Sequence, residues 1–107
     1  MQSPASPAVL QVADGLRKHY GRKLVAVYLC SLPLFGDDDE SADLEFIAVL
    51  DGPVDTATEI LAVGNLASAV SLAQTLVVSI MPVSRAEFVR PGHAFLDLAK
   101  TQARRVA

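Results

Sequence analysis

The chain has 107 residues, of which 51% are hydrophobic, and it carries a formal net charge of −3 with an isoelectric point of about 5.2. Its length predicts a single domain spanning residues 1–107, and its apolar content is sufficient for a core. An acidic chain of this kind is unsuited to binding nucleic acid by neutralising phosphates, and its single cysteine, Cys30, excludes an internal disulfide.

The chain begins with a short polar stretch, residues 1–6, which we expect to be a flexible tail. It lacks the basic region and apolar core of a secretory signal, and no segment reaches the run of about 18 apolar residues that crosses a membrane. With the lone cysteine, this predicts a cytoplasmic protein that does not bind membranes. A helix is predicted from Pro7 to Tyr20, before Gly21, with buried positions at Val9, Val12, Ala13 and Leu16.

Three short apolar runs are predicted to be strands, the first two in a sheet that is covered on both faces. The first is LVAVYL, from Leu24 to Leu29, and the second extends from Leu44 to Leu50, where the turn residues Asp51-Gly52-Pro53 end it. The third is predicted from Leu76 to Met81, because Pro82 has no backbone N–H for a ladder bond.

Three further helices are predicted. One runs from Asp55 to Ala73, with a buried stripe made of Ile60, Val63, Ala67 and Val70, although its Gly64 costs about 1 kcal/mol relative to alanine. Ser84-Arg85-Ala86-Glu87 is typical of a capping box that opens a short helix. The last helix extends from His93 to Val106, with Lys100, Arg104 and Arg105 near its C-terminal end. This order of elements predicts an α/β (α+β) fold, a small mixed β-sheet with helices packed on it.

The stretch between the first two strands, CSLPLFGDDDESADLEF, joins an apolar loop to a run of acids. Its spacing resembles the signature of the minimal nucleotidyltransferases of the polymerase-β-like superfamily, in which Gly-Ser, ten residues and Asp-x-Asp follow one another. Ser31-Leu32 stands at the Gly-Ser position, ten residues follow from Pro33 to Ala42, and Asp43-Leu44-Glu45 stands at Asp-x-Asp. Gly36 falls where the family has its second glycine. The resemblance extends from about Leu10 to Phe95 and implies a nucleotidyltransferase-like fold.

In this family the signature holds metal ions and a nucleoside triphosphate. Carboxylates at i and i+2 of a strand project from one face and hold divalent ions, which stabilise the attacking and leaving oxygens. The small Gly-Ser turn lets backbone N–H groups and a hydroxyl approach the phosphates, and a third carboxylate comes from the next strand. By resemblance, the catalytic and metal-binding positions are Asp43 and Glu45, the phosphate-loop positions are Ser31, Leu32 and Gly36, and the third acid position is Ser79.

Most of these positions depart from the residues that the chemistry requires. Ser31 adds a Cβ where the family has glycine, Leu32 lacks the phosphate-facing hydroxyl, and Pro33 has no N–H for an anion. Glu45 is one methylene longer than aspartate, about 1.5 Å, and Mg²⁺ tolerates little displacement of its ligands. Ser79 is not an acid. We therefore predict an eroded site, in a catalytically inactive nucleotidyltransferase homologue that needs no cofactor and acts through binding.

Other interpretations of these residues stay open. Asp43 and Glu45 are also explained as charged residues at an exposed strand end. The apolar part of the loop, with Leu32, Leu34 and Phe35, either folds back over the end of the sheet or forms an exposed contact surface.

The resemblance also implies partners. Minimal nucleotidyltransferases are often paired with a helical HEPN-domain protein in toxin–antitoxin arrangements, so we expect an antitoxin-type subunit with a HEPN-type partner; a homodimer is equally compatible. The alternative function is an active Mg²⁺-dependent nucleotidyltransferase that uses Asp43 and Glu45 and transfers a nucleotide from a nucleoside triphosphate to a protein or small-molecule acceptor. A third interpretation is a small ligand-binding regulatory domain whose similarity to the family is accidental.

Overall fold

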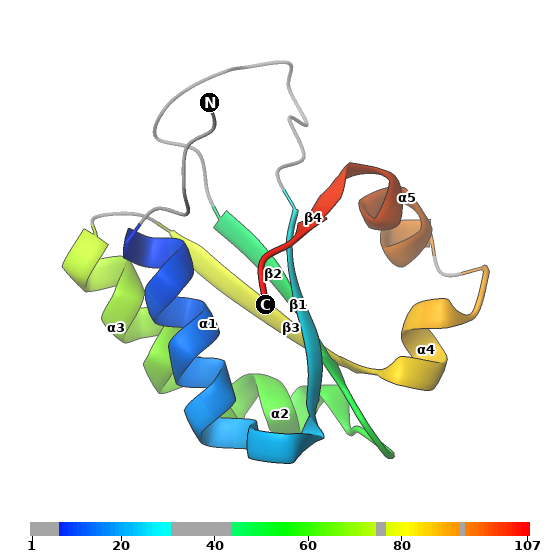
Figure 1. The fold of residues 1–107 in the computed structure, drawn as a ribbon, viewed down its shortest axis with the longest axis horizontal. Coiled ribbons are helices and arrows are strands. Elements are labelled where there is room, and N and C mark those ends of the chain that lie inside the picture. The colour runs from blue at the N-terminus through cyan, green and yellow to red at the C-terminus, as the bar shows by residue number, and fades with distance from the viewer. Residues whose placement is uncertain (1–6, 31–43, 75–76, 93) are drawn as a thin grey trace.

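The computed structural model describes residues 7–30, 44–74, 77–92 and 94–107, which form a sheet of four strands with helices on both sides (Figure 1). The strands lie in the order β3-β2-β1-β4. β1 is antiparallel to β2 and to β4, whereas β2 and β3 are parallel. The predicted mixed sheet is therefore confirmed, with β4 as an additional strand. The bounds are β1 (Leu24–Cys30), β2 (Leu44–Leu50), β3 (Val78–Ser84) and β4 (Ala103–Arg105).

The helices form two groups, one on each side of the sheet (Figure 1). The first group is α1 (Pro7–Tyr20), α2 (Thr56–Ala62) and α3 (Gly64–Gln74), and the second is α4 (Arg85–Val89) and α5 (Ala94–Gln102). Because β2 and β3 are parallel, they need a crossover, and α2 and α3 supply it. A short 3₁₀ helix, η1 (Gly21–Lys23), connects α1 to β1, and Gly21 there has the positive φ, 58°, that favours glycine.

Both faces of the sheet are buried, because alternate residues of each strand pack against different helices. On the first face, Val27 and Phe46 belong to one core cluster with Leu16 of α1. On the second face, Ile47 belongs to another cluster with Leu96 of α5. This burial on two sides explains why β1, and β2 after Glu45, are continuous apolar runs and not an alternation of apolar and polar residues.

The prediction that Pro82 ends the third strand is wrong, since β3 extends from Val78 to Ser84 and contains it. β3 lies at the edge of the sheet, and the Val77 carbonyl accepts a hydrogen bond from the Leu44 N–H (2.9 Å). Successive residues of a strand direct their backbone N–H and C=O groups to opposite sides. Val77 faces β2, so Pro82, five residues later, faces away from β2. Its missing N–H therefore removes no hydrogen bond between β3 and β2. Its carbonyl accepts a hydrogen bond from the Thr56 hydroxyl of α2 instead (3.2 Å).

A second hydroxyl covers the edge of β3 near its start. The Ser71 side chain of α3 accepts a hydrogen bond from the Val78 N–H (3.0 Å). Replacing Ser71 by alanine leaves that N–H without this partner, so we expect the free energy of unfolding to fall by about 1 kcal/mol and the Val78 amide to exchange faster with solvent. The control is alanine at Ser68, which is exposed on the same helix. Equal stability and equal exchange in the two variants would show that the bond contributes nothing.

The predicted helix from Asp55 to Ala73 is in fact two helices. α2 and α3 meet at Val63 and Gly64 with a bend of 47°, which agrees with the low helical propensity of glycine. Val63 is buried as predicted, but Ile60 is 45% exposed, so its assignment to a buried stripe is wrong. That stripe assumed a straight helix, and the bend redirects α2. In the described part of the chain no single helix is long and apolar enough to cross a membrane; only the bent pair α2 and α3, taken together, has the length and composition.

The prediction of one helix from His93, which lies outside the described residues, to Val106 is also wrong. α5 ends before β4, which pairs with the edge of β1. That edge offers backbone groups that need partners, and the Val106 N–H donates to the Val27 carbonyl (2.8 Å). Arg104 and Arg105 therefore lie on a strand and not at the C-terminal end of a helix.

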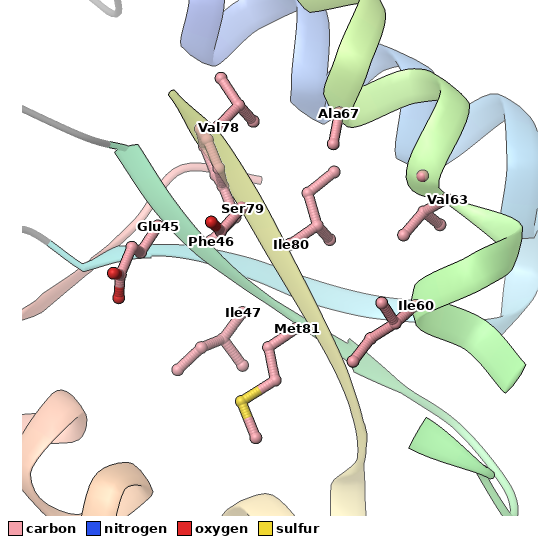
Figure 2. Close-up of a pocket in the computed structure, with 11 residues that line it drawn as sticks. Glu45, Phe46, Ile47, Ile60, Val63, Ala67, Val78, Ser79, Ile80 and Met81 are labelled. Atoms are coloured by element: carbon pink, nitrogen blue, oxygen red, sulfur yellow. The ribbon is translucent and has the colours of Figure 1, made fainter. Parts of the chain in front are cut away.

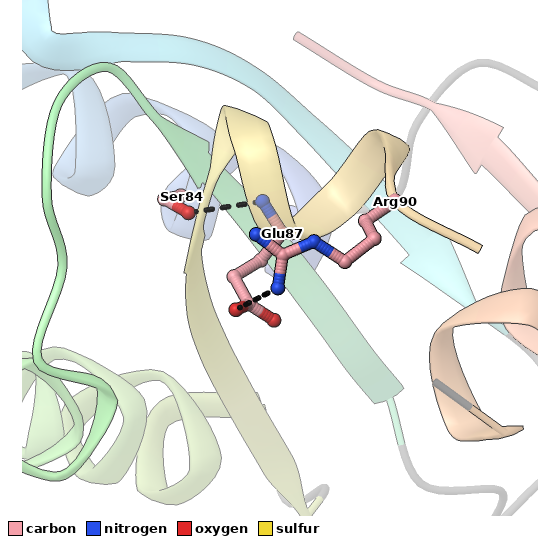
Figure 3. A network of polar contacts seen from close by, with 3 residues as sticks. All are labelled: Ser84, Glu87 and Arg90. Carbon is pink, nitrogen blue, oxygen red and sulfur yellow. Dashed lines mark hydrogen bonds and ion pairs between the residues drawn. The ribbon is translucent and has the colours of Figure 1, made fainter. Parts of the chain in front are cut away.

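Ser84 of the predicted capping box caps α4. The Glu87 N–H donates to the Ser84 hydroxyl (3.0 Å), which is one of the two hydrogen bonds of a capping box (Figure 3). The Glu87 carboxylate forms an ion pair with Arg90 one turn later (3.2 Å). Because α4 begins directly after β3, these contacts fix the direction in which the chain leaves the sheet.

Tyr20, at the end of α1, is tied to α2. Its hydroxyl donates a hydrogen bond to the Glu59 carboxylate (2.8 Å). Burial, and then the hydrogen bond and the negative charge of Glu59, raise the pKa of Tyr20 above its ordinary value of about 10. The neutral hydroxyl is therefore the form that the fold favours.

Replacing Tyr20 by phenylalanine is expected to lower the free energy of unfolding by about 1 kcal/mol at neutral pH. Because the pKa of Tyr20 is raised in the folded state, the unfolded chain loses this proton first. The stability that Tyr20 contributes is thus present below about pH 10 and is lost as the pH rises further. Urea unfolding at about pH 8 and about pH 11 should show a smaller gap between wild type and variant at the higher pH. An equal gap at both pH values would contradict this expectation.

Candidate functional site

Two of the predicted site residues lie next to each other on neighbouring strands. Glu45 of β2 is the register partner of Ser79 in β3, and on its other side it pairs with Cys30 of β1. Strand alternation places Glu45 on the same face as Ile47, the face that α4 and α5 cover. The position predicted for the third acid therefore lies beside the carboxylate predicted to bind metal.

The other predicted site residues lie outside the described residues. These are the phosphate-loop positions and the first acid of the signature: Ser31, Leu32, Gly36 and Asp43. The predicted tail, residues 1–6, and the rest of the loop, residues 31–43, lie there too. The structure thus brings together Glu45 and Ser79, and their assigned roles stay predictions.

A hollow of about 380 Å³ lies beside β3 and contains both side chains; we call it the Glu45 hollow (Figure 2). Glu45 and Ser79 are the polar side chains that line it among the described residues. In Figure 2, Ile80 points toward α2 and α3, whereas Glu45 lies on the other side of β3. The rest of the lining is apolar and comes mainly from Ile60, Val63 and Ala67 of the crossover and from Ile47, Ile80 and Met81 of the sheet.

Cys30, the other neighbour of Glu45, has an unreactive thiol. Its side chain is 1% exposed. Burial, and after it the negative charge of Glu45, raises the pKa of the Cys30 thiol. Since the thiolate is the reactive form, Cys30 is not suited to act as a nucleophile, and it packs as a small apolar residue.

The described residues of the hollow do not by themselves fit two magnesium ions. Mg²⁺ is held by hard oxygen ligands, usually carboxylates, in near-octahedral geometry. Glu45 supplies one carboxylate and Ser79 a neutral hydroxyl. Over residues 7–30, 44–74, 77–92 and 94–107, no group of three or more His, Cys, Asp or Glu side chains is placed to hold a metal ion. What these residues offer is one negative charge at the end of an apolar surface.

The apolar wall of the hollow was missed by sequence reasoning. Ile60 was assigned to a buried stripe, and the bend that brings it to the rim was not foreseen. A signal was present, since residues 60–74 contain no charged side chain. An uncharged segment of that length is consistent with a helix that packs against more than its own sheet.

No protein-family model and no curated protein matches the sequence, but its fold matches solved structures. A crystal structure of a variant of the toxin–antitoxin pair MntA–HpeT matches with a TM-score of 0.55 and 18% identity, over 88% of this chain and 68% of that chain. A crystal structure from Shewanella oneidensis matches with a TM-score of 0.56 and 15% identity, over 96% of this chain and 72% of the other.

A further match is a structure of a tri-AMPylated HEPN toxin from Shewanella oneidensis in complex with an MNT antitoxin. Its TM-score is 0.51 at 17% identity, over 92% of this chain and 70% of the other. The chain therefore has a minimal-nucleotidyltransferase-like fold, and the fold that the resemblance implies is confirmed.

Proposed function

We propose that this chain is an antitoxin-type subunit with a nucleotidyltransferase-like fold, which binds a HEPN-type helical partner and inhibits it by contact, without transferring a nucleotide. The binding half of the proposal is supported by the fold, which is similar to that of MNT antitoxin structures, one of them in complex with a HEPN toxin. The catalytic half is supported by the site.

The observation that carries the catalytic half is the pairing of Glu45 with Ser79. Two-metal catalysis of nucleotidyl transfer requires a cluster of carboxylates, because each metal ion needs several oxygen ligands. At this register a hydroxyl stands beside the carboxylate. Displacement of reacting groups by about 1 Å already costs on the order of a hundredfold in rate, so the loss of a ligand disfavours catalysis strongly.

The binding half is tested by co-expressing the chain with a helical HEPN-type protein as the candidate partner. We expect the two proteins to purify as a complex and the chain to relieve the growth defect that the partner causes alone. Replacing Asp43 by alanine should not abolish the relief of toxicity, because a contact inhibitor needs no metal ligand. A chain that purifies only as a homodimer, or a partner whose toxicity it leaves unchanged, would overturn the proposal.

A further inference from the structure

The Glu45 hollow has its charge at one end and apolar side chains over the rest of its wall. Ile60 and Val63 of the crossover and Met81 of β3 belong to the apolar part, while Glu45 is the charged member. A carboxylate accepts hydrogen bonds and donates none, so it selects a ligand with a positive charge or several N–H donors. The chemistry of the hollow therefore suits a cationic group on an apolar stem.

Glu45 has no partner of its own in the described part of the chain. The ion pairs there are Lys18–Asp14, Arg85–Asp51, Arg90–Glu87 and Lys100–Asp97, none of which includes it. Glu45 is nevertheless only partly exposed. A carboxylate that is partly withdrawn from water is stabilised when a cation reaches it, and none of the described residues supplies a cation to Glu45.

An anionic ligand fits the described wall poorly. No lysine, arginine or histidine lines the Glu45 hollow within the part of the chain that the structure covers. A triphosphate placed there would meet the Glu45 charge without a compensating positive side chain. The described residues thus favour the opposite sign of ligand from a nucleotide.

The apolar surface continues beyond the rim of the hollow. Ile60 at the rim is 45% exposed, and the adjacent Leu61 is 82% exposed. A small molecule that filled the hollow would leave these side chains in water, whereas a protein segment would cover them. Because Glu45 and these exposed side chains lie on opposite sides of the edge strand β3, a protein that covers this edge contacts both, whereas a small molecule does not.

We infer that the Glu45 hollow binds a basic side chain, lysine or arginine, which a partner protein presents next to an apolar side chain. The basic head pairs with Glu45 and bonds to the Ser79 hydroxyl, and its apolar stem lies against Ile47 and Met81 on the same face of the sheet; the neighbouring apolar side chain of the partner covers Ile60 on the other side of β3. This inference rests on the proposed binding role and names the contact that the partner makes.

The first test needs no partner and uses n-hexylguanidinium as the probe, with hexanoate as its matched anion. In a titration of the ¹⁵N-labelled chain, we expect the guanidinium to shift the amide signals of Glu45, Ser79 and Ile80 in a saturable way, and hexanoate to leave them unchanged. Glu45→Gln, checked for an otherwise native spectrum, should weaken guanidinium binding about tenfold, which corresponds to about 1.4 kcal/mol. Equal binding of both probes, no binding of either, or binding unchanged in Glu45→Gln would overturn the inference.

The second test uses the HEPN-type partner and separates this inference from the proposed function. Glu45→Gln should weaken the complex about tenfold, whereas Asp14→Asn, which removes one exposed charge on α1, should not. If the wild-type chain does not bind the partner at all, the proposed function fails, and the guanidinium titration still decides the chemistry of the hollow. If the wild type binds and Glu45→Gln binds equally well, the proposed function stands and this inference fails.

Discussion

Replacing Leu16 by alanine is expected to lower the free energy of unfolding by about 2–5 kcal/mol, the largest loss that we predict for a conservative change in this chain. Leu16 is 0% exposed and belongs to the core cluster that joins α1 to the sheet. The substitution removes buried apolar surface and leaves a cavity, and the surrounding strands relax only partly around it. Thermal unfolding should show a fall of about 10 °C or more in Tm.

The matched control is the same substitution at Leu10 on the same helix. Leu10 is 59% exposed, so its replacement changes helical propensity by the same amount but opens no cavity. We expect the Leu10 variant to stay within about 1 kcal/mol of the wild type. Similar losses at the two positions would contradict the packing of α1 against the sheet.

Replacing Ser79 by aspartate is expected to lower the free energy of unfolding by about 1–2 kcal/mol in the absence of divalent ions, and magnesium should restore it. Glu45 and position 79 are register partners on neighbouring strands, so the new carboxylate meets a like charge at short range. A divalent ion that binds between two carboxylates relieves this repulsion and stabilises the folded state by mass action. The measurement is urea unfolding with and without magnesium.

The control for this prediction is Ser79→Asn, which has nearly the same shape as the aspartate variant and no charge. It should show no dependence of stability on magnesium beyond that of the wild type. If the aspartate and asparagine variants respond alike, then position 79 does not lie within electrostatic reach of Glu45, and the assignment of Ser79 to the third acid position loses its basis.

The parts of the fold that are set by local pattern were predictable from the sequence. The helix from Pro7 to Tyr20 was predicted with its bounds, because apolar spacing and Gly21 act within a few residues of each other. The strand from Leu44 to Leu50 was predicted in the same way, since a strand buried on both faces is almost entirely apolar, as this one is from Phe46 onward. The resemblance to the minimal nucleotidyltransferases then supplied the fold, which spacing alone does not identify.

The parts that depend on neighbours in space were not predictable. Pro82 would end the strand only if a neighbouring strand needed its missing N–H as a hydrogen-bond donor. β3 is an edge strand and Pro82 faces outward, so no neighbouring strand needs that N–H. The C-terminal segment is helical in pattern but becomes β4, because the edge of β1 needs backbone partners. Both outcomes are tertiary effects that override local preference.

The candidate site was predictable only in part, for a similar reason. The signature directed attention to Glu45 and Ser79, and the structure places them side by side. The apolar wall contributed by Ile60 escaped notice because it depends on the bend between α2 and α3. A sequence motif identifies the polar residues of a site, but the apolar surface around them depends on how distant segments pack.

The measurement that tests the central claim most directly is nucleotidyl transfer itself. The purified chain, alone and with a candidate HEPN-type partner, is incubated with radiolabelled ATP and Mg²⁺, beside an Asp43→Ala variant as the control. A site that lacks the third carboxylate and has Glu45 in place of an aspartate should transfer no label to either protein, so wild type and variant should be indistinguishable. Label on the partner or on the chain that disappears with Asp43→Ala would contradict the account and show an active nucleotidyltransferase.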